Sequence, residues 1–169
     1  TIYADQTISN SNLCYNGYSI NNTDNSTIIS ATNCYWGHSS GPYHLSQNPS
    51  GQGDSTNIFV NVTPWFTTPS VDAPPIPVQN LLLTSAADDY VSLAWEPSLI
   101  SDFAGFKLYY DSDSSGFPYA NSLEVGTDTS YTLTGLPPST TIFLAVTVID
   151  IDGNESWYSN EVMNTTRLI

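Results

Sequence analysis

The sequence has very few basic residues. Lys107 and Arg167 are the only two, against sixteen acidic side chains, and the formal net charge of the 169-residue chain is −14 at pH 7. Binding to nucleic acid or to an anionic membrane surface depends on clustered positive charge. The composition therefore argues against both, and instead favours solubility and the binding of cations.

Cysteine and long apolar runs are also scarce. No segment approaches the roughly 20 apolar residues that span a bilayer, so we do not expect membrane insertion. Cys14 and Cys34 are the only cysteines, which allows one bridge but excludes a cysteine-rich zinc module. Thr1 is not followed by the basic and apolar regions of a signal peptide, and we expect a matured product or a part of a longer protein.

Asparagine, serine and threonine are abundant instead. Sequences of the type Asn-X-Ser/Thr make five asparagines candidates for glycosylation: Asn21, Asn25, Asn61, Asn154 and Asn164. Such sequences also arise by chance where asparagine and threonine are common, so both interpretations stay open. Together with the scarcity of lysine, this composition indicates an extracellular or cell-surface chain.

Residues 131–162 carry the clearest local pattern. Apolar residues at every second position from 142 to 148 predict a strand that lies against a core. Turn-forming residues precede and follow it, and a short returning strand is expected over Tyr158–Met163. Further strands are expected over Val78–Thr84, Tyr90–Trp95, Gly105–Tyr110, Ser122–Val125 and Tyr131–Thr134. Seven short strands in about ninety residues predict a two-sheet β-sandwich.

This region contains Trp95, AGFKLYY at residues 104–110 and LPPSTTI at residues 136–142. These stretches resemble the core tryptophan, the third strand and the tyrosine corner of a fibronectin type III domain. The resemblance covers Pro77 to Thr166 and implies an immunoglobulin-like sandwich that acts as a scaffold. Ile142 stands where the family usually has tyrosine, so the hydroxyl bond of that corner is not expected. No Arg-Gly-Asp sequence occurs, which leaves the integrin-binding use of the family without support.

Residues 1–72 show a different pattern. Short strand-like runs are separated by Asn, Asp, Ser and Gly turns, and no helical period occurs. The runs are Thr1–Tyr3, Asn12–Tyr15, Tyr18–Ile20 and Thr27–Ala31. The sequence around Cys14 is echoed twenty residues later around Cys34. A period near twenty is typical of solenoids that are built from short parallel strands.

Three segments of this region are distinctive: NCYWG at residues 33–37, SGPYH at residues 40–44 and NPSGQGD at residues 48–54. They resemble the C-terminal end of right-handed parallel β-helix proteins of the pectate-lyase type. The resemblance covers about residues 10–66 and implies the last rungs of a β-helix with a capping loop. If the two Cys-Tyr pairs lie on adjacent rungs, about 4.8 Å apart, a disulfide joins Cys14 to Cys34. Two reduced core cysteines are the alternative.

Other side chains of this region leave alternatives open. Four aromatic residues are expected to cap the end of the solenoid, with a carbohydrate platform as the alternative: Trp36, Tyr43, Trp65 and Phe66. His38 and His44 are a weak metal candidate with Asp54, because no third ligand lies at short spacing. Aspartate is the only charged residue type in residues 1–72, so an active polysaccharide lyase is not expected there.

Prolines cluster between residues 64 and 77 and predict a short, stiff linker. We place the domain boundary near Asp72, with the terminal β-helix rungs and capping loop in residues 1–72. The fibronectin type III domain then occupies residues 73–169.

Two acidic loops place oxygen atoms at alternate positions, as calcium-binding loops do. Their candidate ligands are Asp111, Asp113, Asp150, Asp152 and Asn154. Neither loop has the acidic twelfth residue of an EF-hand, and plain turns use the same residue types. Calcium is thus a weak candidate, and no other cofactor is expected.

These patterns predict an all-β chain with a short parallel β-helix segment followed by a fibronectin type III sandwich. The function that follows is a non-catalytic structural or adhesive segment of a secreted or cell-surface protein. Its partners are expected to be other proteins or further copies of itself, as in an extracellular filament. The alternative is the C-terminal tail of a polysaccharide-degrading or carbohydrate-binding β-helix protein.

Overall fold

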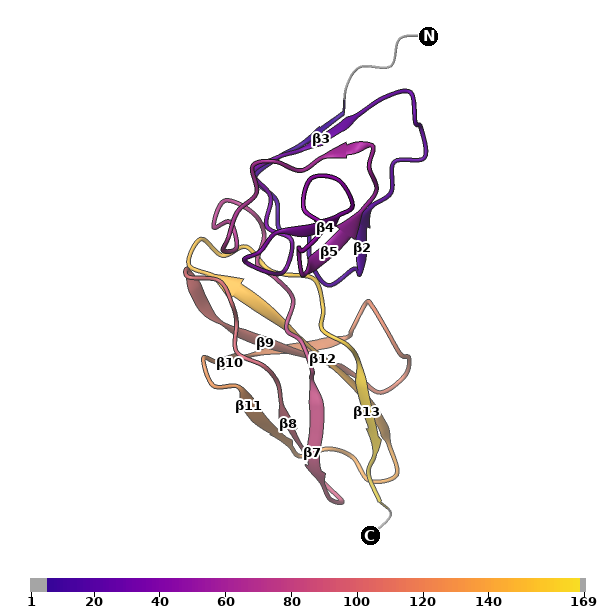
Figure 1. The fold of residues 1–169 in the computed structure, drawn as a ribbon. Coiled ribbons are helices and arrows are strands. Elements are labelled where there is room, and N and C mark those ends of the chain that lie inside the picture. The colour runs from indigo at the N-terminus through magenta and orange to yellow at the C-terminus, as the bar shows by residue number, and fades with distance from the viewer. Residues whose placement is uncertain (1–5, 168–169) are drawn as a thin grey trace. The chain divides into compact units, whose positions relative to one another are not determined.

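The computed structural model describes residues 6–167, and its regular elements are all β-strands (Figure 1). The strand expected over Thr1–Tyr3 lies outside the described residues. Within residues 6–167, no helix is long and apolar enough to cross a membrane. The chain divides into two compact units, one ending at Pro74 and the other beginning at Pro75. The predicted all-β class is confirmed.

Parallel pairing joins the strands of the N-terminal unit. One sheet has the order β1-β3-β6 and the other has the order β2-β5-β4. The strands are β1 (Thr7–Ile8), β2 (Tyr18–Ile20), β3 (Ile29–Ala31), β4 (Pro42–His44), β5 (Gly53–Thr56) and β6 (Val60–Asn61). The parallel direction agrees with the solenoid resemblance. The sheets do not close, however, and the β-helix itself stays a prediction.

The stacked layers of this unit are separated by 23 and then by 31 residues. Thr7 pairs with Ser30, and Ser30 pairs with Asn61. The second interval is longer because β4 and β5 lie in the sequence between β3 and β6. The layers therefore do not follow the twenty-residue echo of the sequence.

The predicted disulfide between Cys14 and Cys34 is not formed, and both thiols are free. Cys14 lies level with Gly37, because a Cβ in place of the Gly37 hydrogen would come within 3.0 Å of the Cys14 Cβ. The two cysteines are thus offset by three residues along the strand direction. That offset corresponds to about 10 Å, whereas a disulfide needs Cα atoms within about 7 Å. Cys34 instead packs in the core of the unit.

The core of the N-terminal unit draws on several layers: Ile20, Ala31, Cys34, Trp36, Val60 and Val62. Trp36 is fully buried, so it belongs to this core and not to an exposed platform. His44 is fully buried as well, with its Nδ1 accepting a hydrogen bond from Gln47 N at 2.9 Å. Its Nε2 lies 3.0 Å from Val60 O. Both ring nitrogens are therefore used within the fold.

Antiparallel pairing joins the strands of the C-terminal unit. Its two sheets have the orders β11-β8-β7 and β10-β9-β12-β13. The strands are β7 (Leu82–Ala86), β8 (Tyr90–Ala94), β9 (Phe103–Asp111), β10 (Asn121–Gly126), β11 (Ser130–Thr134), β12 (Thr141–Asp150) and β13 (Val162–Thr165). This arrangement confirms the predicted two-sheet sandwich.

Alternate side chains of the central strands fill the space between the two sheets. Val91 and Leu93 of β8 are buried, as are Phe106 and Leu108 of β9. Trp95, just after β8, is buried too, and its ring meets the Phe106 ring edge to face with centroids 5.4 Å apart. The alternation in the sequence thus identified the inner face correctly.

β13 begins four residues later than the returning strand expected over Tyr158–Met163. Two serines replace strand residues beside β12. Ser156 N donates to Val148 O, and Ser156 Oγ accepts from Val148 N, both at 2.9 Å. Ser159 makes the same pair of bonds with Val146, at 2.9 and 3.0 Å. Because residues 155–161 do not alternate as a strand would, Trp157 and Tyr158 lie together, with ring centroids 5.3 Å apart.

Candidate functional site

Five aromatic side chains gather beside the sheet β10-β9-β12-β13. They come from β9, from the loop that follows it and from the segment between β12 and β13. Neighbouring ring centroids are 4.9 to 6.2 Å apart. We call this set the aromatic cluster: Tyr109, Phe117, Tyr119, Trp157 and Tyr158.

The cluster has an inner and an outer part. Tyr109, Tyr119 and Tyr158 are half-buried and contact one another. Phe117 and Trp157 each contact Tyr158 and lie with centroids 5.6 Å apart, yet they remain 63% and 66% exposed. Large rings in contact with each other but open to water are typical of interaction surfaces rather than of a core.

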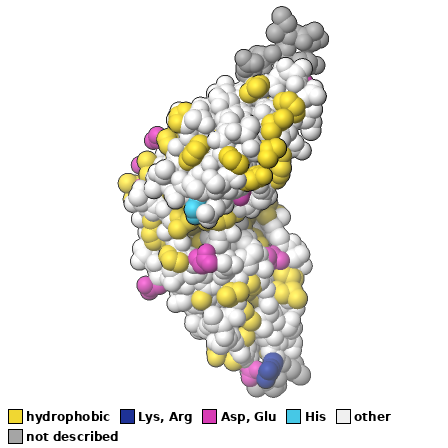
Figure 2. All heavy atoms as spheres, viewed as in Figure 1, with side chains coloured by type: hydrophobic (Ala, Val, Ile, Leu, Met, Phe, Trp, Pro, Cys, Tyr) yellow, Lys and Arg dark blue, Asp and Glu magenta, His cyan; other side chains and the backbone are white. Residues whose placement is uncertain are grey.

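Charged residues make up only 11% of the chain. On the face drawn in Figure 2, acidic side chains are scattered singly and little basic surface is visible. The aromatic cluster brings together Lys107, Glu155 and Glu161. The two carboxylates therefore contact half-buried tyrosines of the cluster, whose neighbour Tyr158 contacts the two exposed rings.

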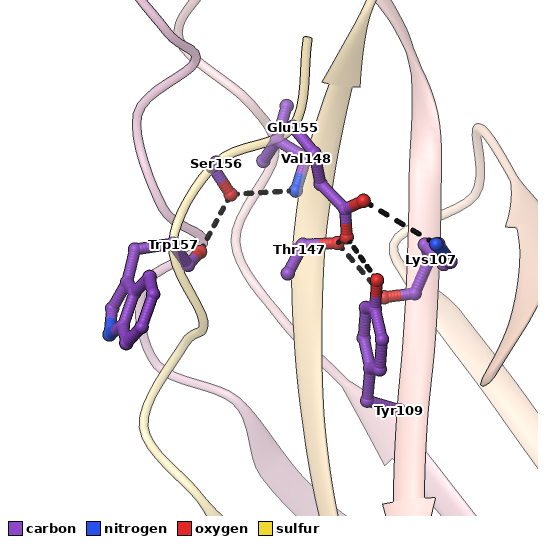
Figure 3. Close-up of polar contacts among 7 residues, drawn as sticks. All are labelled: Lys107, Tyr109, Thr147, Val148, Glu155, Ser156 and Trp157. Carbon is purple, nitrogen blue, oxygen red and sulfur yellow. Dashed lines mark hydrogen bonds and ion pairs between the residues drawn. The ribbon is translucent and has the colours of Figure 1, made fainter. Parts of the chain in front are cut away.

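Glu155 anchors Tyr109, one of the inner tyrosines of the cluster (Figure 3). Its Oε1 accepts hydrogen bonds from Tyr109 Oη and from Thr147 Oγ1, each at 2.6 Å. Its Oε2 lies 3.4 Å from Lys107 Nζ. Burial raises the pKa of Glu155, but the bonds from Thr147 and Tyr109 and the Lys107 charge outweigh burial, so that the pKa lies below its usual range. Glu155 is therefore ionised at neutral pH.

Glu161 anchors a second tyrosine of the cluster. Its Oε2 accepts hydrogen bonds from Tyr119 Oη at 2.7 Å and from Gly116 N at 2.6 Å. Burial and this carboxylate raise the pKa of Tyr119 well above its usual value. The Glu161 bonds thus tie the loop after β9 to the segment before β13.

The predicted calcium residues around Asp150 form a turn instead. Asp150 Oδ1 accepts from Asp152 N and Asn154 N at 3.0 and 2.8 Å, and Oδ2 accepts from Asn154 Nδ2 at 2.9 Å. Burial raises the pKa of Asp150, but the bonds from Asn154 outweigh it and lower the pKa. These bonds give the carboxylate a role in the loop, and calcium at this place stays a prediction.

The other predicted calcium loop is held in the same way. Asp111 Oδ2 accepts from Ala120 N at 2.8 Å, and Oδ1 accepts from Ser112 N and Asp113 N at 2.6 and 3.2 Å. The bond from Ala120 is the main cause of a lowered pKa at Asp111. Among residues 6–167, no group of three His, Cys, Asp or Glu side chains is arranged to hold a metal ion.

The candidate glycosylation residues lie in different settings. Asn21, Asn25 and Asn154 are exposed, whereas Asn61 and Asn164 are half-buried within β6 and β13. Asn154 Nδ2, the atom that a glycan would occupy, already donates to Asp150. Glycosylation stays a prediction at all five.

Sequence reasoning missed the aromatic cluster. It treated Tyr158 as part of a strand and gave no role to Phe117 or Trp157. The signal that was present is the pair of adjacent large aromatic residues at 157 and 158, which follows a turn instead of an alternating run. Two bulky rings side by side cannot both face a core from a regular strand.

The comparisons with known proteins concern the C-terminal unit. Residues 76–163 match the family model described as Fibronectin type III domain. The chain is similar in structure to the chicken CNTN1 FN1-FN3 domains, with 17% identity and a TM-score of 0.51, over 57% of this chain and 34% of that one. It is also similar to the fibronectin type-III domain of human fibronectin type III domain containing protein 3, with 24% identity, a TM-score of 0.48, and 57% and 89% coverage. No curated protein sequence matches the chain.

Proposed function

Because the chain belongs to the fibronectin type III family, we propose that it is a non-catalytic adhesive module of a secreted or cell-surface protein. Fibronectin type III domains are generally non-catalytic and typical of extracellular, adhesive or structural proteins. The chain covers about a third of the CNTN1 fragment, so what the longer protein does is part of this proposal.

The observation that carries the proposal is the exposure of Phe117 and Trp157. Covering the exposed two thirds of such a ring removes on the order of 100–160 Å² from water, which contributes roughly 2.5–4 kcal/mol. Aromatic residues are also over-represented among the residues that dominate binding at protein interfaces. The surface that we assign to adhesion is therefore the aromatic cluster.

A second candidate function is carbohydrate binding by the N-terminal unit. A groove of about 330 Å³ beside β2, β5 and β4 is lined by Tyr18, Tyr43, Leu45 and Ile58, and none of its lining residues is charged. Tyrosine rings in an uncharged groove suit a neutral sugar. This candidate corresponds to the alternative interpretation of the sequence, the C-terminal tail of a carbohydrate-binding β-helix protein.

Adhesion of coated beads separates the two candidates. Beads carry the full chain, the double variant Phe117→Ser/Trp157→Ser, or Leu99→Ser as a matched control, because Leu99 is a 54% exposed apolar residue outside the cluster. They are applied to immobilised extracellular-matrix proteins and to immobilised polysaccharides.

We expect retention on at least one protein surface, at least tenfold lower for the double variant and unchanged for Leu99→Ser. Equal retention of all three kinds of bead would contradict the role of the aromatic cluster. Retention on polysaccharide alone would favour the second candidate.

A further inference from the structure

The aromatic cluster already contains one contact between a cation and a ring. Lys107 Nζ lies 4.9 Å from the centroid of the Tyr109 ring. Lys107 is the only lysine of the chain, and its ion pair with Glu155 occupies it further. In the inner part of the cluster, the protein itself thus supplies a cation, Lys107.

Among residues 6–167, no cation lies over the outer rings, Phe117 and Trp157. The other basic residue is Arg167, whose carbonyl oxygen accepts a hydrogen bond from Ser139 N just before β12. Arg167 also lies six residues beyond Glu161 on the extended chain that includes β13, a separation on the order of 20 Å. Within the described residues, the chain therefore cannot supply a cation to its two exposed rings.

Carboxylates make the surroundings of these rings attractive to a positive charge. Glu161 uses Oε2 for both of its bonds, to Tyr119 and Gly116, which leaves Oε1 for a further donor. The net charge of −14 adds a long-range attraction for a cationic partner. Charge complementarity thus selects the occupant of this surface.

We propose that the aromatic cluster binds an arginine side chain that lies between apolar residues of a partner protein. The guanidinium stacks on the exposed ring of Trp157 or Phe117 and donates to Glu161 Oε1, while the flanking apolar side chains cover the remaining ring surface. This inference rests on the proposed adhesive function and names the chemistry of the partner.

Arginine suits the site better than lysine for two physical reasons. Its planar guanidinium can lie flat on an aromatic face and still donate in its own plane to a carboxylate. It is also more weakly hydrated than an ammonium group. Covering a guanidinium with aromatic surface therefore costs less hydration free energy than covering an ammonium group.

The test uses two blocked pentapeptides as probes, Gly-Leu-Arg-Leu-Gly and the same peptide with citrulline in place of arginine. Citrulline keeps the shape and the stacking plane but removes the charge. The full chain is titrated with each peptide, and the NMR signal of the Trp157 indole N–H reports binding. We expect the dissociation constant to be at least tenfold lower for the arginine peptide, and the difference to shrink as salt is added.

Variants assign the contacts. Trp157→Ala is expected to abolish measurable binding of the arginine peptide, followed by the backbone amide signals of Gly116 and Tyr119. Glu161→Gln is expected to weaken the arginine peptide about fivefold and to leave the citrulline peptide unchanged. Leu99→Ala is the matched control and should leave both peptides unaffected.

Three results would overturn the inference. Equal binding of the two peptides would show an apolar surface without a preference for cations, and the adhesive function would still stand if bead retention is lower for the Phe117→Ser/Trp157→Ser variant. Indole shifts caused by cellohexaose but not by the arginine peptide would assign the surface to sugar. If neither peptide binds and bead retention is also insensitive to the cluster, both the inference and the proposed function fail.

Discussion

Replacing Ser156 by alanine is expected to destabilise the C-terminal unit by about 2 kcal/mol. Ser156 Oγ accepts a hydrogen bond from Val148 N at 2.9 Å and donates to Trp157 O at 2.7 Å. Val148 is fully buried, so alanine leaves its N–H without an acceptor in a place that water does not reach. A buried donor without a partner costs about 1–3 kcal/mol, which dominates the loss of the second bond.

Urea unfolding of the full chain measures this loss, and hydrogen exchange at Val148 N locates it. The matched control is Ser159→Ala, because Ser159 Oγ accepts from Val146 N at 3.0 Å and donates to Asn160 O at 2.8 Å. Ser159 is only half-buried, so water can replace its hydroxyl and the loss should be about half as large. A loss below about 0.5 kcal/mol for Ser156→Ala, or unchanged exchange at Val148, would refute the role of this hydroxyl as a strand substitute.

Three further predictions concern titratable groups. Tyr109→Phe removes a hydrogen bond to Glu155, which should raise the pKa of Glu155 in an NMR titration and cost about 1 kcal/mol in urea unfolding. The folded-state pKa values of Asp111, Asp150 and Glu155 are lowered. The stability that these groups contribute is therefore complete at neutral pH and is lost as pH falls below about 4. A urea midpoint that does not change between pH 7 and pH 3 would contradict this. Burial and the nearby Asp54 charge raise the pKa of Cys14 to about 12, so iodoacetamide at pH 8 should label it only after unfolding, and reducing agent should leave the thermal midpoint unchanged.

The sandwich could be predicted where burial decides the pattern. β8, β9 and β12 each have one face against the core, and a period of two in apolar residues records that face directly. The last strand was misplaced because serine hydroxyls, and not strand carbonyls, accept the hydrogen bonds of Val146 N and Val148 N, while the carbonyls of both valines pair with serine N–H groups. A serine hydroxyl that replaces a strand carbonyl as acceptor produces no periodic pattern in the sequence.

The N-terminal unit shows how an echo in the sequence can mislead. Parallel strands were expected and are present, but the two Cys-Tyr pairs occupy different environments. Tyr15 is 44% exposed, whereas Tyr35 is 6% exposed and bridges Asn12 and Phe66 in neighbouring layers. Residues at equivalent positions in neighbouring layers of a solenoid should be buried to a similar extent. The different exposure of Tyr15 and Tyr35 therefore shows that the two Cys-Tyr pairs are not at equivalent positions, although their sequences match.

The candidate site could not be predicted from the sequence because its residues come from three separate segments. Tyr109 comes from β9, Phe117 and Tyr119 from the following loop, and Trp157 and Tyr158 from a segment about forty residues further on. Two carboxylates of the segment between β12 and β13 join these segments: Glu155 bonds to side chains of the sheet, and Glu161 bonds to the loop after β9. Pattern reasoning sees neither a contact between distant segments nor the task of a single carboxylate.

The way in which these carboxylates are used explains why the outer rings suit recognition. Glu155 and Glu161 bind the hydroxyl groups of Tyr109 and Tyr119, so the inner rings are fixed before any partner arrives. A rigid base lowers the conformational entropy that binding would otherwise cost. The hydroxyl protons of Tyr109 and Tyr119 are thereby engaged within the fold, and the exposed surface consists of the apolar faces of Phe117 and Trp157 beside the Glu161 carboxylate. Such a surface discriminates by charge more than by shape, and a cation with a flat face is the group that satisfies both of its parts.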